Sequence, residues 1–279
     1  MTSLVNQQSV LEFRARRGVL SGDFEDTRVV ILSTTDPVGG TPVAETVAFH
    51  HDEGGRLLIV AAASEDGSLP RWYGNVLADP RVCVETGTSL MEAEARPLSG
   101  RERDIVYARL AQAAPALEDK QRLMDAAMPI VVLEPLSRAR LGAEPWGAEL
   151  IAVHDGLRRE LALVRSEFAS SGPKIAAQLR INCLVACGML NHHHVSEDEE
   201  VFPLLERRRP GLAPALALLR EQHRQMQQLL DRLGEAVADE AAGPAWALAE
   251  VDRLTVELEE HLDYEEEQLV SILNSVTSR

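Results

Sequence analysis

Cysteines are scarce in this chain of 279 residues, and the three present, Cys83, Cys183 and Cys187, make an odd number. An odd count argues against a disulfide framework and predicts reduced thiols. The first residues, MTSLVNQQSV, lack the basic start and the long apolar core of a signal peptide. No apolar run approaches the roughly 20 residues that a membrane span needs. We therefore expect a cytoplasmic protein with no membrane partner.

Basic residues are also few, since 28 Lys and Arg face 44 Asp and Glu and leave a net charge of −16. Phosphate backbones require a basic surface, so this balance excludes nucleic acid as a partner. The 45% apolar and 26% charged content is typical of a globular protein without disorder. The length predicts two domains.

The N-terminal half contains short β-rich segments separated by Gly, Pro and Asp turns. These segments are RVVILSTT, PVAETVAF, RLLIVAAA, RVCVET and MPIVVLEPL. Helical stretches are expected near Pro70–Leu77 and Gly100–Ala127. Strands of this length with few long helices predict a β-barrel or an α+β domain, which we place at residues 1–138. The aperiodic stretch 135–147, with two prolines and two glycines, is the expected boundary.

The C-terminal half is helical throughout, and we place this second domain at residues 147–279. Four helices are expected, at Gly147–Ala169, at Pro173–Arg208, from the RPGLAP break to Ala238, and at Ala245–Val276. Four long helices with short breaks predict an up-down four-helix bundle. The fold class is therefore a two-domain α+β protein.

Each of the four helices places one histidine toward the bundle interior when residues are rotated by about 100° each. Two glutamates follow a histidine by four residues and therefore share its side of the helix. The resulting set is His154, His193, Glu197, His223, His261 and Glu265. Glu266 is the alternative to Glu265 as the inward carboxylate, but its side chain points about 140° away from that of His261 on a regular helix.

The neighbours of His193 are expected to have lesser roles. His192 and His194 point about 100° to either side of His193, which predicts positions on the helix flank. Asp198, Glu199 and Glu200 are expected mostly at the surface.

The six inward side chains predict a metal site. A single inward histidine is more often a hydrogen-bonded core residue, and a charged helix with incidental histidines is the alternative. Buried carboxylates, however, are costly unless they are paired or bind metal. Nitrogen and oxygen donors without thiolates suit iron, manganese or zinc. Four imidazoles and two acids exceed one tetrahedral ion and fit two ions bridged by carboxylates.

Four segments of this half resemble the hemerythrin-like domain over residues 147 to 275. They are AVHDGLRRE, NHHHVSEDEEVFPLL, LREQHRQM and EEHLDYEEEQL. The resemblance implies a non-haem di-iron centre with the six residues named above as ligands. Oxygen-carrying hemerythrins have a second histidine one turn after the first on the third helix, where this chain has Gln227. This difference leaves room for water, dioxygen or nitric oxide and favours redox reactivity or sensing over reversible oxygen carriage.

Four segments of the N-terminal half resemble the deazaflavin-dependent nitroreductase family over residues 8 to 136. They are VLEFRARRGVLSGDF, ILSTTDPVGGTPVAETV, SLPRWYGNVLADPRVCVETG and PIVVLEPL. The resemblance implies a split β-barrel that holds the deazaflavin coenzyme F-420, or alternatively FMN. The cofactor-binding residues implied are Thr34, Thr35, Gly39, Gly40, Trp72, Tyr73 and Asn75. Ordinary packing is the alternative role for Trp72 and Tyr73.

One loop of the barrel departs from this family. Where the family has the basic pattern GRKSGxPR, this chain has DPVGGTPV, so both cationic positions are lost. A Gly-rich loop still offers backbone N–H groups to a phosphate, but without charge-assisted bonds. Another small ligand, or a barrel without coenzyme, therefore stays open.

The main functional hypothesis is an oxidoreductase in which the barrel passes electrons to a di-iron centre that reacts with dioxygen, peroxide or nitric oxide. The alternative is a sensor or binding protein for oxygen, nitric oxide or iron, with a degenerate barrel that forms a homodimer. A third hypothesis is iron storage or protection from oxidative damage.

Overall fold

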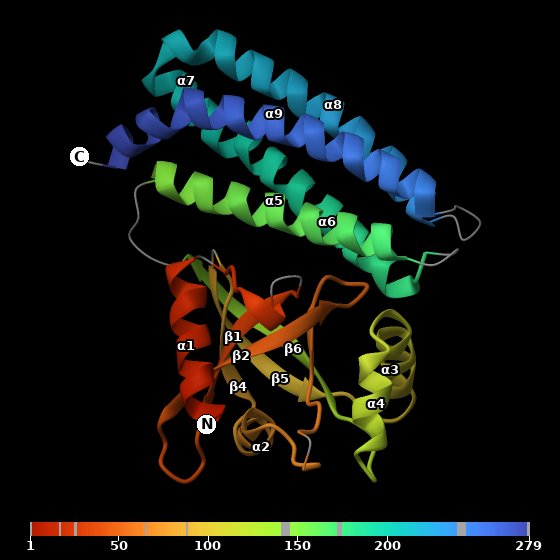
Figure 1. Cartoon of the computed structure of the whole chain (residues 1–279). Helices are drawn as coiled ribbons and strands as arrows, with labels where there is room; N and C mark the ends of the chain where they lie inside the picture. Colours follow the sequence, from red (N-terminus) through yellow and green to blue (C-terminus); the bar gives the residue numbers. More distant parts are fainter. Residues whose placement is uncertain are drawn as a thin grey trace. The chain divides into compact units, whose positions relative to one another are not determined.

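The computed structural model describes residues 2–16, 18–24, 27–64, 66–87, 89–140, 146–171, 175–238 and 244–277. The chain forms two compact units, Met1–Gly142 and Ala143–Arg279 (Figure 1). Among the described residues, no helix has the length and apolar character needed to cross a membrane.

The first unit is a closed barrel of six strands in the order β1-β2-β3-β6-β5-β4. The strands are β1 (Val29–Thr35), β2 (Pro42–His51), β3 (Leu57–Val60), β4 (Arg81–Glu85), β5 (Ser89–Pro97) and β6 (Ile130–Arg140). Every neighbouring pair is antiparallel. Alternate residues of each strand fill the interior, as Val30 and Leu32 of β1 do.

Strand β5 is absent from the five strands expected from the sequence. Its inward positions are Met91, Ala93 and Ala95, while Glu92 and Glu94 are exposed. Apolar and polar residues alternate along this strand, but Ala and Glu are uncommon in strands, so the segment has a weak strand propensity in the sequence. The strand is nevertheless fixed by pairing with both β4 and β6.

The helices of the first unit surround the barrel (Figure 1). They are α1 (Thr2–Ala15), the short η1 (Gly22–Phe24), α2 (Arg71–Ala78), α3 (Gly100–Ala113) and α4 (Ala116–Arg122). The single helix expected over Gly100–Ala127 is two helices, because Pro115 interrupts it. Helix α2 is attached to β1 by a buried hydrogen bond from Asn75 Nδ2 to Thr34 Oγ1, 2.9 Å long.

Two adjacent histidines at the end of β2 make the barrel sensitive to acid. Burial lowers the pKa of His51 from 6.5 to about 4, and the Arg28 guanidinium acts in the same direction. The pKa of His50 is lowered to about 4 by the same two causes. Between these values the unfolded chain binds protons that the folded barrel does not, so the free energy of unfolding falls as the pH falls from about 6.5.

We expect the barrel to lose about 2 kcal/mol of stability per histidine between pH 7 and pH 5. The His51→Gln variant should lose about half as much as the parent chain over this range, because one of the two titrating groups is gone. Urea-dependent hydrogen exchange of the barrel amides measures this loss in the full chain. Equal losses of stability in the parent chain and in His51→Gln would contradict a role of His51 in the acid sensitivity.

The second unit is a bundle of four long helical segments (Figure 1). They are α5 (Trp146–Ser170), α6 (Ala177–Ser196) continued through a π-helical turn η2 (Glu197–Val201) and α7 (Phe202–Arg208), then α8 (Ala213–Ala238) after the short η3 (Pro210–Leu212), and α9 (Pro244–Thr277). The expected start of the second helix at Pro173 lies outside the described residues. Apolar residues of all four segments form the core between them.

The start of α5 lies unusually close to the end of α9. The Gly147 N–H donates a 2.9 Å hydrogen bond to Asn274 Oδ1. A Cβ atom at Gly147 would lie 2.5 Å from both Asn274 Oδ1 and the Val270 carbonyl oxygen, so only glycine fits there. This contact fixes the relative position of the two helices that supply His154 and His261.

Candidate metal centre

Helix α6 and the π-helical turn η2 that continues it direct three donor side chains into the bundle. His194 and Glu197 are each 4% exposed, and the side chain of His193 is 11% exposed. On a helix, Glu197 falls between His193 and His194 in direction, because it lies about 40° from the first and about 60° from the second. One helical segment therefore supplies two imidazoles and one carboxylate to the same interior space.

The other three helices complete the set of donors. His154 of α5 and Glu265 of α9 are fully buried, at 0% exposure, and His223 of α8 and His261 of α9 are 4% and 1% exposed. The rings lie against one another across the helices. His194 stacks on His223 with ring centroids 4.2 Å apart, and His154 meets His193 edge to face at 5.1 Å.

These side chains fall into two donor groups. The first group is His194, His223 and His261, and the second group is His154, His193, Glu197 and Glu265. Within each group the candidate ligand atoms all lie within 4.8 Å of one another. Three or four nitrogen and oxygen donors at this separation can surround one cation.

The two carboxylates lie between the groups. Glu197 Oε2 is 3.5 Å from His193 Nε2 of the second group and 3.7 Å from His223 Nε2 of the first. Glu265 Oε2 is 3.6 Å from His154 Nε2 of the second group and 3.5 Å from His261 Nε2 of the first. Each carboxylate is therefore positioned to bridge two cations, one in each group.

The outward nitrogens of three imidazoles are held by hydrogen bonds. His154 Nδ1 is 2.9 Å from Glu266 Oε1, His223 Nδ1 is 3.0 Å from Asp198 Oδ1, and His261 Nδ1 is 3.0 Å from Gln222 Oε1. Each of these oxygens accepts the Nδ1 proton, which leaves the Nε2 lone pair free to face the interior.

The inward atoms, in contrast, have no hydrogen-bond partners among the described residues. They are Nε2 of His154, His193, His194, His223 and His261, with Glu197 Oε2 and both carboxylate oxygens of Glu265. Unpaired buried polar atoms are costly, and eight of them in one place are not explained by packing. A pair of divalent cations would satisfy all eight, so the residues fit such a group.

Burial shifts the pKa of every donor toward its neutral form. It lowers the pKa of His154 to about 3, of His193 to about 3 and of His261 to about 2, so these imidazoles are neutral and able to bind a cation. Burial raises the pKa of Glu265 to about 7. Burial, together with the charge of Glu265, raises the pKa of Glu197 well above its ordinary value. Cations would therefore replace protons on this carboxylate pair.

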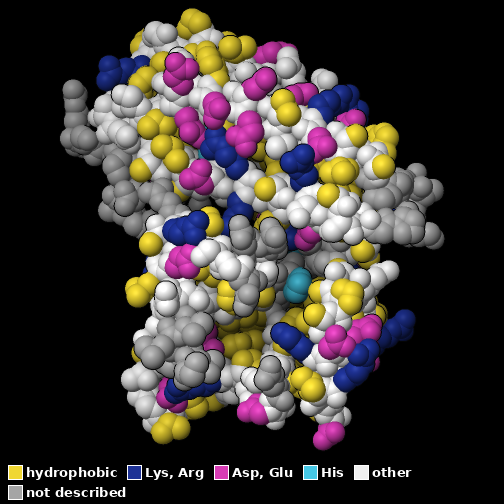
Figure 2. All heavy atoms as spheres, in the orientation of Figure 1, with side chains coloured by type: hydrophobic (Ala, Val, Ile, Leu, Met, Phe, Trp, Pro, Cys, Tyr) yellow, Lys and Arg dark blue, Asp and Glu magenta, His cyan; other side chains and the backbone are white. Residues whose placement is uncertain are grey.

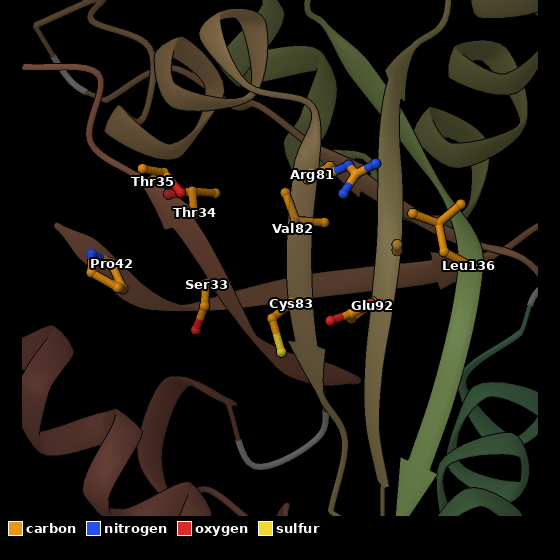
Figure 3. Close-up of a pocket in the computed structure, with 10 residues that line it drawn as sticks. Ser33, Thr34, Thr35, Pro42, Arg81, Val82, Cys83, Glu92 and Leu136 are labelled. Carbon is orange, nitrogen blue, oxygen red and sulfur yellow. The ribbon is translucent and has the colours of Figure 1, made fainter. Parts of the chain in front are cut away.

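The barrel contains a second feature of interest, a pocket with a volume of about 280 Å³. Its lining comes from five strands and consists of Ser33, Thr34, Thr35, Pro42, Arg81, Val82, Cys83, Glu92, Ala93 and Leu136. Figure 3 shows Ser33 and Cys83 on neighbouring strands, where they are register partners. The lining is mostly apolar, and its hydroxyl, thiol, guanidinium and carboxylate groups are the few polar groups that could orient a small ligand.

The turn between β1 and β2 is organised by Asp36. The Val38 N–H donates to Asp36 Oδ1 at 3.0 Å, and the Gly40 N–H donates to the Asp36 carbonyl oxygen at 2.8 Å. Arg71 at the start of α2 forms an ion pair with the Asp36 carboxylate. Two backbone donors and one cation near this turn are therefore engaged within the protein itself.

Both halves of the chain match known families. Residues 148–273 match the family model described as "Hemerythrin HHE cation binding domain". The C-terminal half is a hemerythrin-like domain. Residues 6–135 match the model described as "F420H(2)-dependent quinone reductase", and this half is a domain of the deazaflavin-dependent reductase type.

Several solved structures are similar to the chain. An F420-H2 dependent reductase (FDR-A) is 27% identical, with 38% of this chain and 93% of that chain covered and a TM-score of 0.35. A structure described as a domain-swapped dimer is also 27% identical, covers 48% of this chain and 98% of that chain, and has a TM-score of 0.36. HutZ, the heme storage protein from Vibrio cholerae, is 14% identical, with 48% of this chain and 92% of that chain covered and a TM-score of 0.31.

The six residues predicted as ligands from helical spacing lie together in the hemerythrin-like domain. Gln227, at the position of the missing second histidine of the third helix, instead donates to Asp231 Oδ1 at 2.7 Å. His194, expected on the helix flank, is the residue that completes the first donor group. A fifth imidazole is thus supplied by α6 rather than by α8.

A signal for His194 is present in the sequence. The inward apolar residues Ala186 and Leu190 lie about 20° and 60° from His193, in the direction of His194. The interior direction therefore falls between the two histidines, and both reach it. The structure places His194 inward together with His193, and not on the helix flank.

Asp198 is the other difference on this helix. It was expected mostly at the surface with Glu199 and Glu200, and those two glutamates are exposed. Asp198 is half-buried and accepts the Nδ1 proton of His223. The π-helical turn η2 (Glu197–Val201) adds a residue to the helical turn and changes the direction of the side chains within it, and regular helical rotation does not anticipate such a turn.

The predicted cofactor residues of the barrel are distributed over three places. Thr34 and Thr35 line the pocket. Trp72 is 3% exposed in the barrel core, with Tyr73 packed against the same core and Asn75 bonded to Thr34. Gly39 and Gly40 lie in the turn between β1 and β2. Packing explains Trp72 and Asn75 without a ligand, and a role of the seven residues in cofactor binding stays a prediction.

Proposed function

We propose that this chain is an oxidoreductase with a di-iron centre in its hemerythrin-like domain. The centre would react with dioxygen, peroxide or nitric oxide and receive electrons from a reduced deazaflavin or FMN bound by the barrel. The observation that carries the proposal is the pair of donor groups with two buried carboxylates between them. The fusion of a reductase-like domain to a cation-binding domain supports the coupling of the two sites.

The seven donors have distinct roles in this proposal. The ions would be held by His194, His223 and His261 on one side, by His154 and His193 on the other, and by Glu197 and Glu265 between them. Bound iron would supply reversible one-electron chemistry. The second group offers one imidazole fewer than the first, which leaves more room there for a small ligand.

The surrounding residues exclude water and hold the donors in place. Phe202 stacks on His223 with ring centroids 5.5 Å apart. Leu190, Met226 and Leu262, each within three residues of a donor in sequence, are almost fully buried. Apolar walls strengthen electrostatic interactions in the centre, because they remove competing water.

A transfer assay tests the coupling of the two domains. We expect the iron-loaded full chain to oxidise reduced deazaflavin or reduced FMN at least about 10-fold faster than its His193→Ala variant, since loss of a ligand weakens the second group. The matched control is His192→Ala, because His192 is exposed on the same helix. Equal rates for all three proteins would contradict electron transfer to the centre.

A sensor or binding protein is the second candidate function. It is favoured by the turn between β1 and β2, where Asp36 engages Arg71 and the N–H groups of Val38 and Gly40. In this case the barrel would bind no coenzyme and would form a homodimer. Equilibrium titration of the full chain with FMN and with deazaflavin separates the two functions. If the chain binds neither coenzyme, the result supports the sensor, and if it binds one of them, the result supports the oxidoreductase.

A further inference from the structure

The outward face of His154 belongs to a hydrogen-bonded network between α5 and α9. The His154 Nδ1 proton is accepted by Glu266 Oε1 at 2.9 Å. The same oxygen also accepts a hydrogen bond from Arg158 Nη1 at 2.8 Å. Arg158 and Glu266 therefore act on His154 through one shared atom.

Arg158 is itself held in a fixed position by two more acids of α9. Its Nε donates to Glu259 Oε2 at 2.8 Å, and its Nη2 donates to Asp263 Oδ1 at 3.0 Å. Glu259, Asp263 and Glu266 are spaced by four and three residues, so they form one row along the helix. Figure 2 shows acidic side chains gathered around basic ones over the face of α5 and α9. The guanidinium fork matches this row, which a lysine cannot do.

The acids of this row differ in exposure. The side chains of Asp263 and Glu259 are 75% and 45% exposed, whereas those of Arg158 and Glu266 are 21% and 23% exposed. The ion pair of Arg158 with Glu266 is thus the better shielded from solvent and the one in contact with a metal-site imidazole. The two outer acids serve to hold the guanidinium.

We propose that Arg158 is a positioning residue that sets the metal affinity of the second donor group through Glu266 and His154. The proposal rests on the metal centre proposed above. Arg158 prevents Glu266 from turning toward water, and Glu266 then fixes the His154 tautomer that presents Nε2 to the interior. The first donor group has a separate partner for this purpose, since Asp198 accepts the Nδ1 proton of His223.

Cobalt titration of the metal-free full chain tests this inference. Co²⁺ is the probe, and its visible absorption together with calorimetry reports the affinity of each binding step. We expect two steps in the parent chain. Glu266→Gln keeps an acceptor oxygen but removes the negative charge beside His154 and the ion pair with Arg158, so it should weaken one step by about 10-fold and leave the other unchanged. Asp198→Asn should weaken the opposite step, which assigns the two steps to the two groups.

The decisive comparison is between arginine variants. Arg158→Gln should weaken the same step as Glu266→Gln, and the double variant should match Glu266→Gln alone, because Arg158 acts only through Glu266. Arg165→Gln is the matched control, since Arg165 makes an ion pair with Asp252 between the same two helices. It should bind Co²⁺ as the parent does.

Three results for the arginine variants would contradict a positioning role of Arg158. The inference is overturned if Arg158→Gln behaves like Arg165→Gln, if it weakens both steps equally, or if the two losses add in the double variant. Arg158→Lys, which keeps the charge without the fork, should fall between the parent and Arg158→Gln, and it replaces Arg158→Gln if that variant does not fold. A parent chain that binds no Co²⁺ contradicts the proposed centre instead.

Discussion

The His194→Ala variant is expected to retain about one iron ion per chain after gel filtration, whereas the parent chain retains about two. His194 is one of three imidazoles in the first donor group, and its side chain is 4% exposed. Removing it leaves that position with His223, His261 and the shared carboxylates. We expect the affinity of this position to fall by at least about 100-fold, which is about 2.7 kcal/mol.

The neighbouring histidine provides the control for this variant. His192 is exposed on the same helix, so His192→Ala should keep both ions. Elemental analysis gives the metal content, and circular dichroism shows whether each variant keeps its helices. If His194→Ala binds as much iron as His192→Ala, then His194 is a core residue and not a ligand.

The second large effect concerns stability without metal. Glu265 is completely buried, and neither of its carboxylate oxygens has a hydrogen-bond partner in the described structure. In the metal-free chain this group destabilises the bundle, because its polar atoms are removed from water without compensation. Replacing Glu265 with leucine should therefore raise the free energy of unfolding of the metal-free chain by about 1 to 3 kcal/mol.

The same substitution should abolish the stabilisation that metal provides. In the parent chain, added Fe²⁺ or Co²⁺ should raise the melting temperature, since a ligand that binds only the folded state stabilises it. In Glu265→Leu this rise should be largely lost. The control is Glu260→Leu at an exposed position of α9, where changes within about 0.5 kcal/mol are expected. A Glu265→Leu chain that is less stable than the parent without metal would show that the carboxylate has a structural role.

Much of the bundle could be predicted because an α-helix has a fixed rotation and rise per residue. A rotation of about 100° per residue is enough to place His154, His223 and His261 inward from the sequence alone. The same rule is less informative for α6 and η2, because their three donors spread over an arc of about 100° and rotation alone does not show how much of that arc is buried. The width of the bundle interior decides how many side-chain directions on a helix are buried. This width depends on the distances between the four helices and not on any single helix.

Other features depend on interactions that no local pattern contains. The π-helical turn that brings Asp198 to His223 is one such feature. Strand β5 is another, because its Ala and Glu residues have low strand propensity and pairing with both β4 and β6 holds it in the sheet. The barrel pocket combines residues from β1 to β6 that are up to about a hundred positions apart, so its lining follows from strand pairing rather than from any single segment.

Iron stoichiometry decides whether the paired donor groups form a di-iron centre. The full chain would be loaded with Fe²⁺ without oxygen, freed of unbound metal, and then measured by elemental analysis and Mössbauer spectroscopy. We expect about two iron ions per chain in two distinct nitrogen- and oxygen-rich environments, since the donor groups differ in their number of imidazoles. Retention of no iron, or of a single ion in one environment, would contradict the paired centre.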